Sequence, residues 1–237
     1  MKKRILSIVL ILCMVLMLCP VTAFAEDSYC TLTWNFQYGT LIHNGVEQKT
    51  SPYVYRANRG DAISLVHVEN CSPYEFVGWK EAGSGTVYKP DTIFMMDDSE
   101  YTFDAVYQVQ GSLAITVDGF EVGKTPADCT YSFESTIPGV TFSEDDILFV
   151  GWEEFVFDGS DYVTKRISNT DVFEADTRYQ VLFDLNNKGL DMAPAVTVNG
   201  KTPEFCAIAT SSGVPIRLQI TCTLGTPAEP PAPSLVR

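Results

Sequence analysis

The stretch Phe76-Val77-Gly78-Trp79 recurs 73 residues later as Phe149-Val150-Gly151-Trp152. A glycine in a strand lets another backbone approach closely, and it lets the large indole of the next residue lie flat. Burial of an aromatic side chain of this size contributes about 2–3 kcal/mol of transfer free energy. We therefore expect Trp79 and Trp152 to anchor the cores of two copies of one unit. The structural signature of that unit is Phe76, Gly78, Trp79 and Phe149, Gly151, Trp152.

Other landmarks surround both motifs in the same order. An Asn-Gly or Asp-Gly pair stands upstream of each motif, and a proline, Pro52 or Pro126, follows each of these glycines by seven residues. Downstream, residues 92–101 align without a gap with residues 170–179. The stretch from tryptophan to tyrosine spans 22 residues in the first copy and 27 in the second. These spacings indicate an internal duplication, with about five extra residues in one loop of the second copy.

A third, partial copy follows the second. Residues 195–200 (AVTVNG) resemble residues 114–119 (AITVDG), and the Lys-Thr-Pro run that begins at Lys124 recurs at Lys201. A third Phe-Val-Gly-Trp motif would fall near residue 230, where the chain has prolines instead. We expect this last unit to be a truncated module that closes the array as a cap.

The residue pattern after position 25 is that of strands. Apolar and polar residues alternate from Tyr101 to Val109, and residues 179–185 repeat the pattern, as in half-buried strands. The Asn-Gly and Asp-Gly pairs are strong signals for tight hairpin turns. We predict a mainly β fold of small tandem modules. Each module has room for one short helix, between Pro52 and Gly60 or between Pro126 and Ile137.

The two ends of the chain differ from the middle. Residues 1–25 have a basic start, an apolar run and an Ala-Phe-Ala cleavage site, which is the layout of a secretory signal peptide. No later apolar segment approaches the ~20 residues of a transmembrane helix. We therefore expect a secreted protein, free or associated with a cell wall. The predicted organisation is a signal peptide at 1–25, repeat modules at 26–110 and 111–187, a truncated third module or cap at 188–226, and a Pro-rich tail at 227–237.

The charge of the chain argues against two classes of partner. Thirty acidic residues face 16 basic ones, for a formal net charge of −14, and removal of the three basic residues of the signal peptide makes this −17. Nucleic acids and anionic membranes are bound by clusters of lysine and arginine. We expect neither as a partner.

A longer pattern contains the first Phe-Val-Gly-Trp motif. It runs Tyr74-x-Phe-x-Gly-Trp79, then a Met96-Asp97-Asp98 turn, then a strand that ends in Ala105-Val106-Tyr107. This pattern resembles the internalin-type B repeat, in the divergent form found in exported proteins of Gram-positive bacteria. The first copy matches throughout residues 31–108. The second has Glu174-Ala175-Asp176 in place of the Met-Asp turn and lacks the final alanine.

The resemblance implies small β-grasp-like modules strung along secreted or wall-associated proteins. It also implies a role in spacing, adhesion or contact with a host surface, without catalysis.

Residues that could carry chemistry are few. His43 and His67 are the only histidines, and no nucleophile elbow, zinc-protease helix or phosphate-binding glycine loop is present. We therefore predict no catalytic residue, no cofactor and no metal site. Acidic clusters are read as solvated turns, with a glycosidase carboxylate pair or a Ca²⁺ site as alternatives. They are Asp97-Asp98-Ser99-Glu100, Glu144-Asp145-Asp146, and Glu153-Glu154 with Asp158 and Asp161.

Two further sequence features allow alternatives. Arg59-Gly60-Asp61 spells an integrin-binding tripeptide, although a Gly-Asp turn before a strand explains it equally. Lysine and asparagine are both available for an intramolecular isopeptide bond, but nothing local marks a pair.

Export permits disulfides. An odd number of cysteines leaves at least one thiol unpaired, with Cys206 and Cys222 as the most local pair and fully reduced thiols as the alternative. The cysteines after the signal peptide are Cys30, Cys71, Cys129, Cys206 and Cys222.

Three functions fit these observations. The first is a secreted, repeat-built adhesion, binding or spacer protein that contacts a protein or glycan at the host or bacterial surface. The second is a carbohydrate-binding β module attached to, or partnering, a secreted glycan-active enzyme, with Trp34, Tyr53 and Tyr55 as exposed aromatics. The third is a hydrolase that uses an acidic pair. Burial of the tryptophans favours a scaffold, whereas an exposed aromatic row favours sugar binding.

Overall fold

The structure is a computed structural model that describes residues 29–97 and 100–229. The predicted signal peptide lies outside these residues, as do Asp98, Ser99 and positions 230–237. The described chain is mainly β, as predicted, and its only helical elements are two short 3₁₀ turns, η1 (Pro126–Asp128) and η2 (Glu144–Asp146). It divides into two compact units, the first made of residues 29–68 and 77–106 and the second of residues 69–76 and 107–229.

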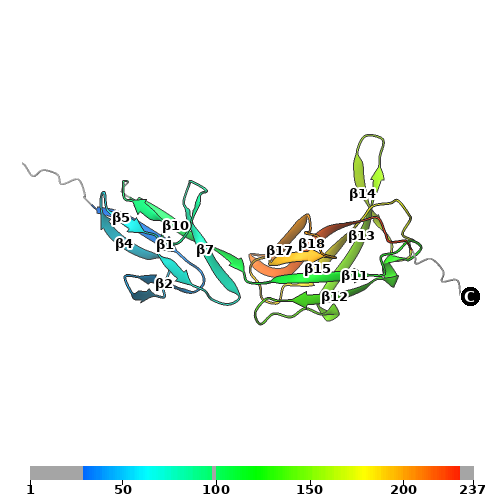
Figure 1. Ribbon diagram of the computed structural model, residues 1–237, viewed down its shortest axis with the longest axis horizontal. Helices are drawn as coiled ribbons and strands as arrows, with labels where there is room; N and C mark the ends of the chain where they lie inside the picture. Colours follow the sequence, from blue (N-terminus) through cyan, green and yellow to red (C-terminus); the bar gives the residue numbers. More distant parts are fainter. Residues whose placement is uncertain (1–28, 98–99, 230–237) are drawn as a thin grey trace, which may run out of the picture. The chain divides into compact units, whose positions relative to one another are not determined.

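The first unit is built on a five-stranded sheet of order β4-β1-β10-β7-β8 (Figure 1). Its strands are β4 (Tyr53–Asn58), β1 (Tyr29–Asn35), β10 (Glu100–Val109), β7 (Tyr74–Glu81) and β8 (Val87–Tyr88). β1 pairs in parallel with β10 and antiparallel with β4. Two small sheets, β3-β2-β6 and β5-β9, complete the unit. They contain β2 (Thr40–His43), β3 (Val46–Gln48), β6 (His67–Glu69), β5 (Ala62–Ser64) and β9 (Ile93–Met95).

Aromatic side chains fill the core of the first unit. Trp79 is fully buried, and its indole N–H donates to the carbonyl of Val66 over 2.6 Å. Trp34, which the sequence suggested as an exposed aromatic, is also fully buried and stacks on Tyr53 with ring centroids 5.7 Å apart. The expectation for Trp34 was wrong because alternate residues of β1 point inward, and position 34 belongs to the inward set.

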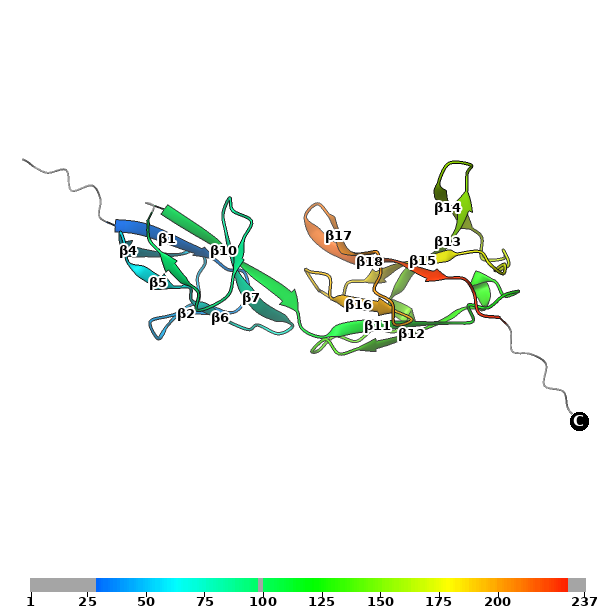
Figure 2. The ribbon, with the colours of Figure 1, turned by 45° about the horizontal axis from the view of Figure 1, so that its top comes forward.

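The second unit is a sandwich of two sheets (Figure 2). A three-stranded sheet of order β12-β11-β16 faces a five-stranded sheet of order β14-β13-β15-β18-β17. The first contains β12 (Thr130–Ser135), β11 (Ser112–Asp118) and β16 (Ala195–Val198). The second contains β14 (Tyr162–Ile167), β13 (Ile147–Phe157), β15 (Tyr179–Asn186), β18 (Val214–Gly225) and β17 (Phe205–Ser211).

The core of the sandwich is centred on Trp152. Its buried ring lies 4.9 Å from that of Phe173 and 5.4 Å from that of Phe120, measured between centroids. The indole N–H donates to the hydroxyl of Tyr131 over 3.2 Å, which joins β13 of one sheet to β12 of the other. Burial raises the pKa of Tyr131 to about 12, so this hydroxyl stays neutral and keeps its hydrogen-bond partner over the working pH range.

The segment predicted to be a partial third copy contributes strands to both sheets of the second unit. β16 pairs in parallel with β11, and β18 pairs antiparallel with β15. In the first unit, by contrast, β1 and β10 pair directly with each other. Residues 195–225 therefore supply a strand to each sheet of the second unit, next to β11 and next to β15.

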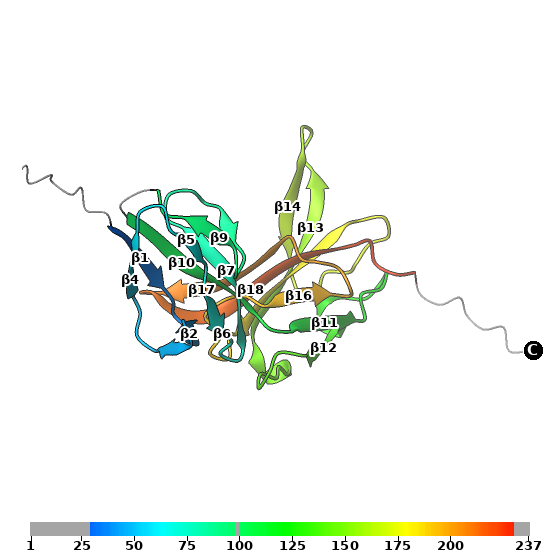
Figure 3. The same cartoon turned by 60° about the vertical axis from the view of Figure 1, so that its left-hand side comes forward.

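The hairpin that follows Trp152 is longer than the one that follows Trp79. Trp79 is paired with Tyr88, nine residues later, whereas Trp152 is paired with Ile167, fifteen residues later. β13 and β14 consequently extend beyond the rest of their sheet as a projecting hairpin, which all three ribbon views show (Figure 3).

The remaining predictions on local structure have mixed outcomes. Residues 53–58, where a short helix had room to form, are strand β4, and the stretch after Pro126 holds only the turn η1. Of the predicted tail, residues 227–229 are described: Pro227 is buried, and Ala228 exchanges backbone hydrogen bonds with Phe120 and Val122. Within the described residues there is no helix of the length and apolarity required to cross a membrane.

Removal of residues 188–237 should unfold the second unit. The deletion strips β15 of its partner β18 and exposes apolar side chains of both sheets. We expect Trp152 fluorescence to shift to the wavelength of a solvated indole, and amide hydrogen exchange to lose protection throughout residues 112–186, while residues 53–58 stay protected. A truncated chain that keeps a buried Trp152 and a cooperative melt would contradict the structural role of this segment.

The two signature glycines should differ in their tolerance of alanine. A Cβ on Gly78 would overlap the backbone carbonyl of Tyr88, whereas a Cβ on Gly151 would meet the end of the Arg166 side chain and the ring of Phe149, which can move. We expect Gly78→Ala to lower the free energy of unfolding by about 2–3 kcal/mol. Gly151→Ala should stay within about 1 kcal/mol of the parent, because alanine also restricts the unfolded chain. Urea denaturation of the matched pair measures this, and equal losses would contradict it.

Candidate functional site

The six signature residues do not lie in equivalent surroundings. Trp79 and Trp152 are core residues, and Phe76 is buried with its ring 5.9 Å from that of Tyr107. Phe149, the counterpart of Phe76, is 44% exposed. Glycine precedes tryptophan in both strands, but β8 backbone fills the space over Gly78 and side chains fill the space over Gly151. The second copy thus presents part of the signature to solvent.

Phe149 belongs to the surface of the five-stranded sheet that faces away from the sandwich core, here called the outer face. Val181, Phe183 and Leu185 of β15 are buried, so the residues between them point outward. Directly paired residues lie on the same side of a sheet, and the pairs Phe149–Asp184, Leu182–Thr221 and Phe205–Thr221 extend this face across four strands. The outer face consists of Phe149, Gly151, Glu153, Phe155 and Phe157 (β13), Tyr162, Thr164 and Arg166 (β14), Arg178, Gln180, Leu182 and Asp184 (β15 and the residue before it), Arg217, Gln219, Thr221 and Thr223 (β18), and Phe205 (β17).

A groove of about 320 Å³ lies in the middle of the outer face. Phe149 and Phe205 line it, the latter 49% exposed, together with Leu182, Thr221, Asp184, Gln219 and Arg166. The groove therefore combines exposed aromatic rings with an amide, a carboxylate, a hydroxyl and a guanidinium group. Apolar walls with a few placed polar groups are typical of small-ligand sites.

Arginine side chains of the outer face lie against aromatic rings or carboxylates. The Arg166 guanidinium is 5.2 Å from the centroid of Phe149, and that of Arg178 is 4.9 Å from the centroid of Phe155. Arg217 forms an ion pair of 2.9 Å with Asp184. Three of the seven arginines in the chain thus lie on this one face, which carries two carboxylates, Glu153 and Asp184. The outer face is locally positive on a chain that is strongly negative overall.

The outer face continues onto the projecting hairpin. Phe157 and Tyr162 are paired near its tip, with ring centroids 5.5 Å apart and exposed fractions of 57% and 64%. The turn between them is closed by the Asp158 carboxylate, which accepts hydrogen bonds from the backbone of Ser160 and Asp161. These bonds lower the pKa of Asp158. The acidic tip is therefore a structural turn that displays two aromatic rings.

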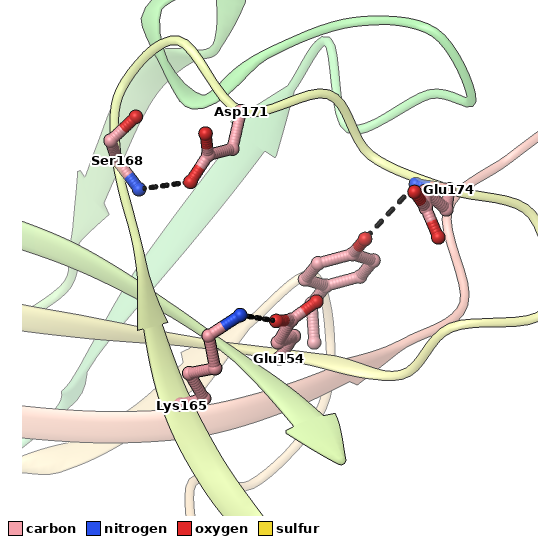
Figure 4. A network of polar contacts seen from close by, with 6 residues as sticks. Glu154, Lys165, Ser168, Asp171 and Glu174 are labelled. Carbon is pink, nitrogen blue, oxygen red and sulfur yellow. Dashed lines mark hydrogen bonds and ion pairs between the residues drawn. The ribbon is translucent and has the colours of Figure 1, made fainter.

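A second hollow, of about 480 Å³, lies on the opposite side of the hairpin (Figure 4). Lys165 donates to Glu154 over 2.9 Å, a bond that raises the pKa of Lys165. The Asp171 carboxylate accepts from the backbone of Ser168, and the backbone N–H of Glu174 donates to the Tyr179 hydroxyl. The first contact joins the two strands of the hairpin, the second closes a turn in the loop of residues 168–174, and the third ties that loop to β15. We assign the network a structural role.

Both histidines line a groove of about 510 Å³ in the first unit, together with Tyr55 and Asp91. His43 is buried, its Nδ1 lies 3.1 Å from the Tyr53 hydroxyl, and burial lowers its pKa. A neutral His43 packed among aromatic rings serves the core. Among the described residues no group of three or more histidine, cysteine, aspartate or glutamate side chains is arranged to hold a metal ion.

The buried Asp146 of the Glu144-Asp145-Asp146 cluster and the Arg-Gly-Asp tripeptide are held in local structure, whereas Asp98 and Ser99 of another acidic cluster lie outside the described residues. Asp146 is buried, accepts from the backbone of Ser143 and lies 2.5 Å from the Lys188 ammonium. The Asp61 carboxylate accepts from the backbone of Asn58, within its own turn. Arg59 donates to the carbonyl of Asp97. These contacts account for the residues as turn-forming elements.

All five described cysteines are free, so Cys206 and Cys222 are not paired. Cys206 lies opposite Ile220, two residues from Cys222 along β18. Burial raises the pKa of Cys129, Cys206 and Cys222 to about 11. Cys71 is the exposed one among the five.

Sequence reasoning missed the outer face as a surface. It assigned Phe149 and Gly151 to the repeat signature and assigned no role to Arg166, Phe205 or Gln219. A signal was available in β13 and β14, where apolar residues occupy both alternating positions at the hairpin end, Phe155 to Phe157 and Tyr162 to Val163. A hairpin that is apolar on both sides, with no second layer to cover it, must expose aromatic surface.

Comparison of the chain with protein-family models, with curated proteins and with solved structures gave no match.

Thiol reactivity should separate Cys71 from the other cysteines. In a chain that begins at residue 26, Ellman's reagent at pH 8 should modify Cys71 quickly. A thiol with a pKa of about 11 has roughly one part in a thousand as thiolate at that pH, so Cys129, Cys206 and Cys222 should react at least 100-fold more slowly. Denaturation without reductant should release all five thiols. Recovery of only three would indicate a disulfide and contradict the structure.

Proposed function

We propose that this chain is an exported, non-catalytic binding protein, built from repeated β modules of the internalin B type, which contacts a protein or glycan at the host or bacterial surface through the outer face of its second unit. The observation that carries the proposal is the exposure of Phe149. A residue whose counterpart in the first copy is buried lies here at the wall of a groove, opposite a second exposed phenylalanine, Phe205.

The burial of the tryptophans supports a scaffold role for the repeat itself. Trp34, Trp79 and Trp152 are all inside, so none is free to contact a ligand directly. The second unit has a projecting hairpin and the strands β17 and β18, which border the outer face, whereas the first unit has two small sheets in addition to its five-stranded one. A constant core with variable surface elements is the usual arrangement in binding scaffolds.

A carbohydrate-binding module is the second candidate, and the groove favours it. Phe149 and Phe205 can pack against the apolar face of a sugar ring, while Asp184, Gln219 and Thr221 offer acceptors and donors for its hydroxyl groups. Tyr53 and Tyr55, the aromatics first considered for this role, pack around Trp34 instead.

Loss of both groove aromatics should abolish binding. The chain from residue 26 and its Phe149→Ala/Phe205→Ala variant would be applied to a glycan array with bacterial cell-wall glycans, to matrix proteins and to host cells. We expect the parent to be retained on at least one of these surfaces, and the variant to bind at least tenfold more weakly.

A matched control removes apolar surface from the same strands outside the groove. Leu148 on β13 and Ile216 on β18 are also exposed, and neither lines the groove. Leu148→Ala/Ile216→Ala should bind as the parent does. Equal binding by both double variants, or no retention of the parent on any surface, would overturn the proposal. A role as a spacer would then be the remaining interpretation.

A further inference from the structure

The second signature glycine has a use that the first does not. A Cβ on Gly151 would occupy the position of the Arg166 Nη1 atom and would lie 2.8 Å from the Phe149 ring. Glycine at this position leaves the guanidinium room to lie over the Phe149 ring, with its Cζ 5.2 Å from the ring centroid. Gly151, Phe149 and Arg166 thus form a platform at one wall of the groove, here called the arginine platform.

Arg166 retains capacity for a ligand. Its Nε lies 3.5 Å from Oε1 of Glu153, which is too long for a strong charge-assisted bond, while Gln180 donates to the other oxygen of that carboxylate, Oε2, over 2.6 Å. The Arg166 side chain is 51% exposed and lines the groove. By contrast, Arg217 is engaged at 2.9 Å by Asp184, whose second oxygen accepts from Gln219. A planar guanidinium that lies over an aromatic ring and keeps exposed N–H groups is suited to a carboxylate.

We propose that the arginine platform recognises a single carboxylate on the terminal sugar of a glycan, with Phe149 and Phe205 packing against the sugar ring. The inference rests on the proposed function and names the ligand class of the same site. It depends on two observations: Arg166 is exposed in the lining of the groove, and the groove volume of about 320 Å³ suits one or two sugar residues.

The other anionic ligands fit less well. A polyanion would meet a chain of net charge −14 through a face with three arginines and two carboxylates, and long-range repulsion opposes such a complex. An acidic peptide would seek a sheet edge for backbone hydrogen bonds. The groove lies on the face of the sheet, and three of the strands that line it, β13, β15 and β18, pair with neighbours on both sides, while β17 is an edge strand. Recognition on the face uses side chains, which suits a sugar.

The test compares ligands that differ only in the carboxylate. Dissociation constants of the chain from residue 26 would be measured by calorimetry or NMR titration for sialyllactose against lactose, and for a glucuronic-acid-terminated disaccharide against its glucose-terminated counterpart. We expect one carboxylated ligand to bind about tenfold more tightly than its neutral partner at 0.15 M salt. Arg166→Gln should remove that difference, and Arg166→Lys should restore only part of it.

Two further variants test the geometry. Lys165→Gln removes an equal charge from the neighbouring position on the opposite side of β14, and it should leave the preference for the carboxylate unchanged. Gly151→Ala keeps Arg166 but displaces it, and it should weaken the preference about as much as Arg166→Gln. Thermal melts establish that each variant is folded.

The outcomes separate this inference from the proposed function. If binding to a neutral glycan or to a protein requires Phe149 and Phe205 but is indifferent to Arg166, the outer face is a binding site and the carboxylate inference is wrong. If Lys165→Gln acts as strongly as Arg166→Gln, the effect is one of net charge, and the platform is again refuted. If no ligand or surface depends on the groove aromatics, both proposals fail.

Discussion

The hydrogen bond from the Trp152 indole to the Tyr131 hydroxyl crosses the interior of the second unit and links its two sheets. An indole is large enough to span much of the space between packed sheets, and a buried indole N–H that has no partner costs free energy. Tyr131 supplies that partner from β12, and the rings of Phe120 and Phe173 close around the indole. The position of β13, and with it the groove residues on its other side, follows from this one buried group.

The glycine before the tryptophan shows how one sequence motif supports two arrangements. In the first unit the missing side chain admits the backbone of β8, which pairs closely with β7. In the second unit it admits the guanidinium of Arg166. The tryptophan has the same role in both cases because burial of the indole is required for folding. The surface side of the same strand is free to change, and the proposed binding site lies there.

The segment after residue 187 extends both sheets of the second unit at once. β16 joins β11 in the smaller sheet, while β17 and β18 widen the larger one. The wider sheet is what creates an outer face, because Phe205, Gln219 and Thr221 come from these added strands. Without them the groove would have one aromatic wall, and Phe149 would stand alone beside Arg166.

Alternation of apolar and polar residues was sufficient to predict a mainly β chain, because side-chain direction in a strand depends only on local geometry. Trp79 and Trp152 were predicted to be buried from their size and spacing, and they are. Trp34 was assigned to the surface, although it alternates with threonines along β1 in the same register as Cys30 and Leu32 and so belongs to the inward set. The duplication itself stays a prediction from the spacing of its landmarks.

The sequence alone thus determined the fold class and the core tryptophans, since periodicity and hydrophobic size are properties of short stretches. Only the tertiary structure decided which side of β13 faces solvent, and that Phe205, 56 residues further along the chain, stands across the groove from Phe149. Phe149 and Phe205 come to line the same groove because of the strand order: β13, β15, β18 and β17 are neighbours in the sheet, although β14, β16 and long loops separate them in sequence. Pairing between distant strands depends on how two sheets bury a common core, and no local pattern of residues records it.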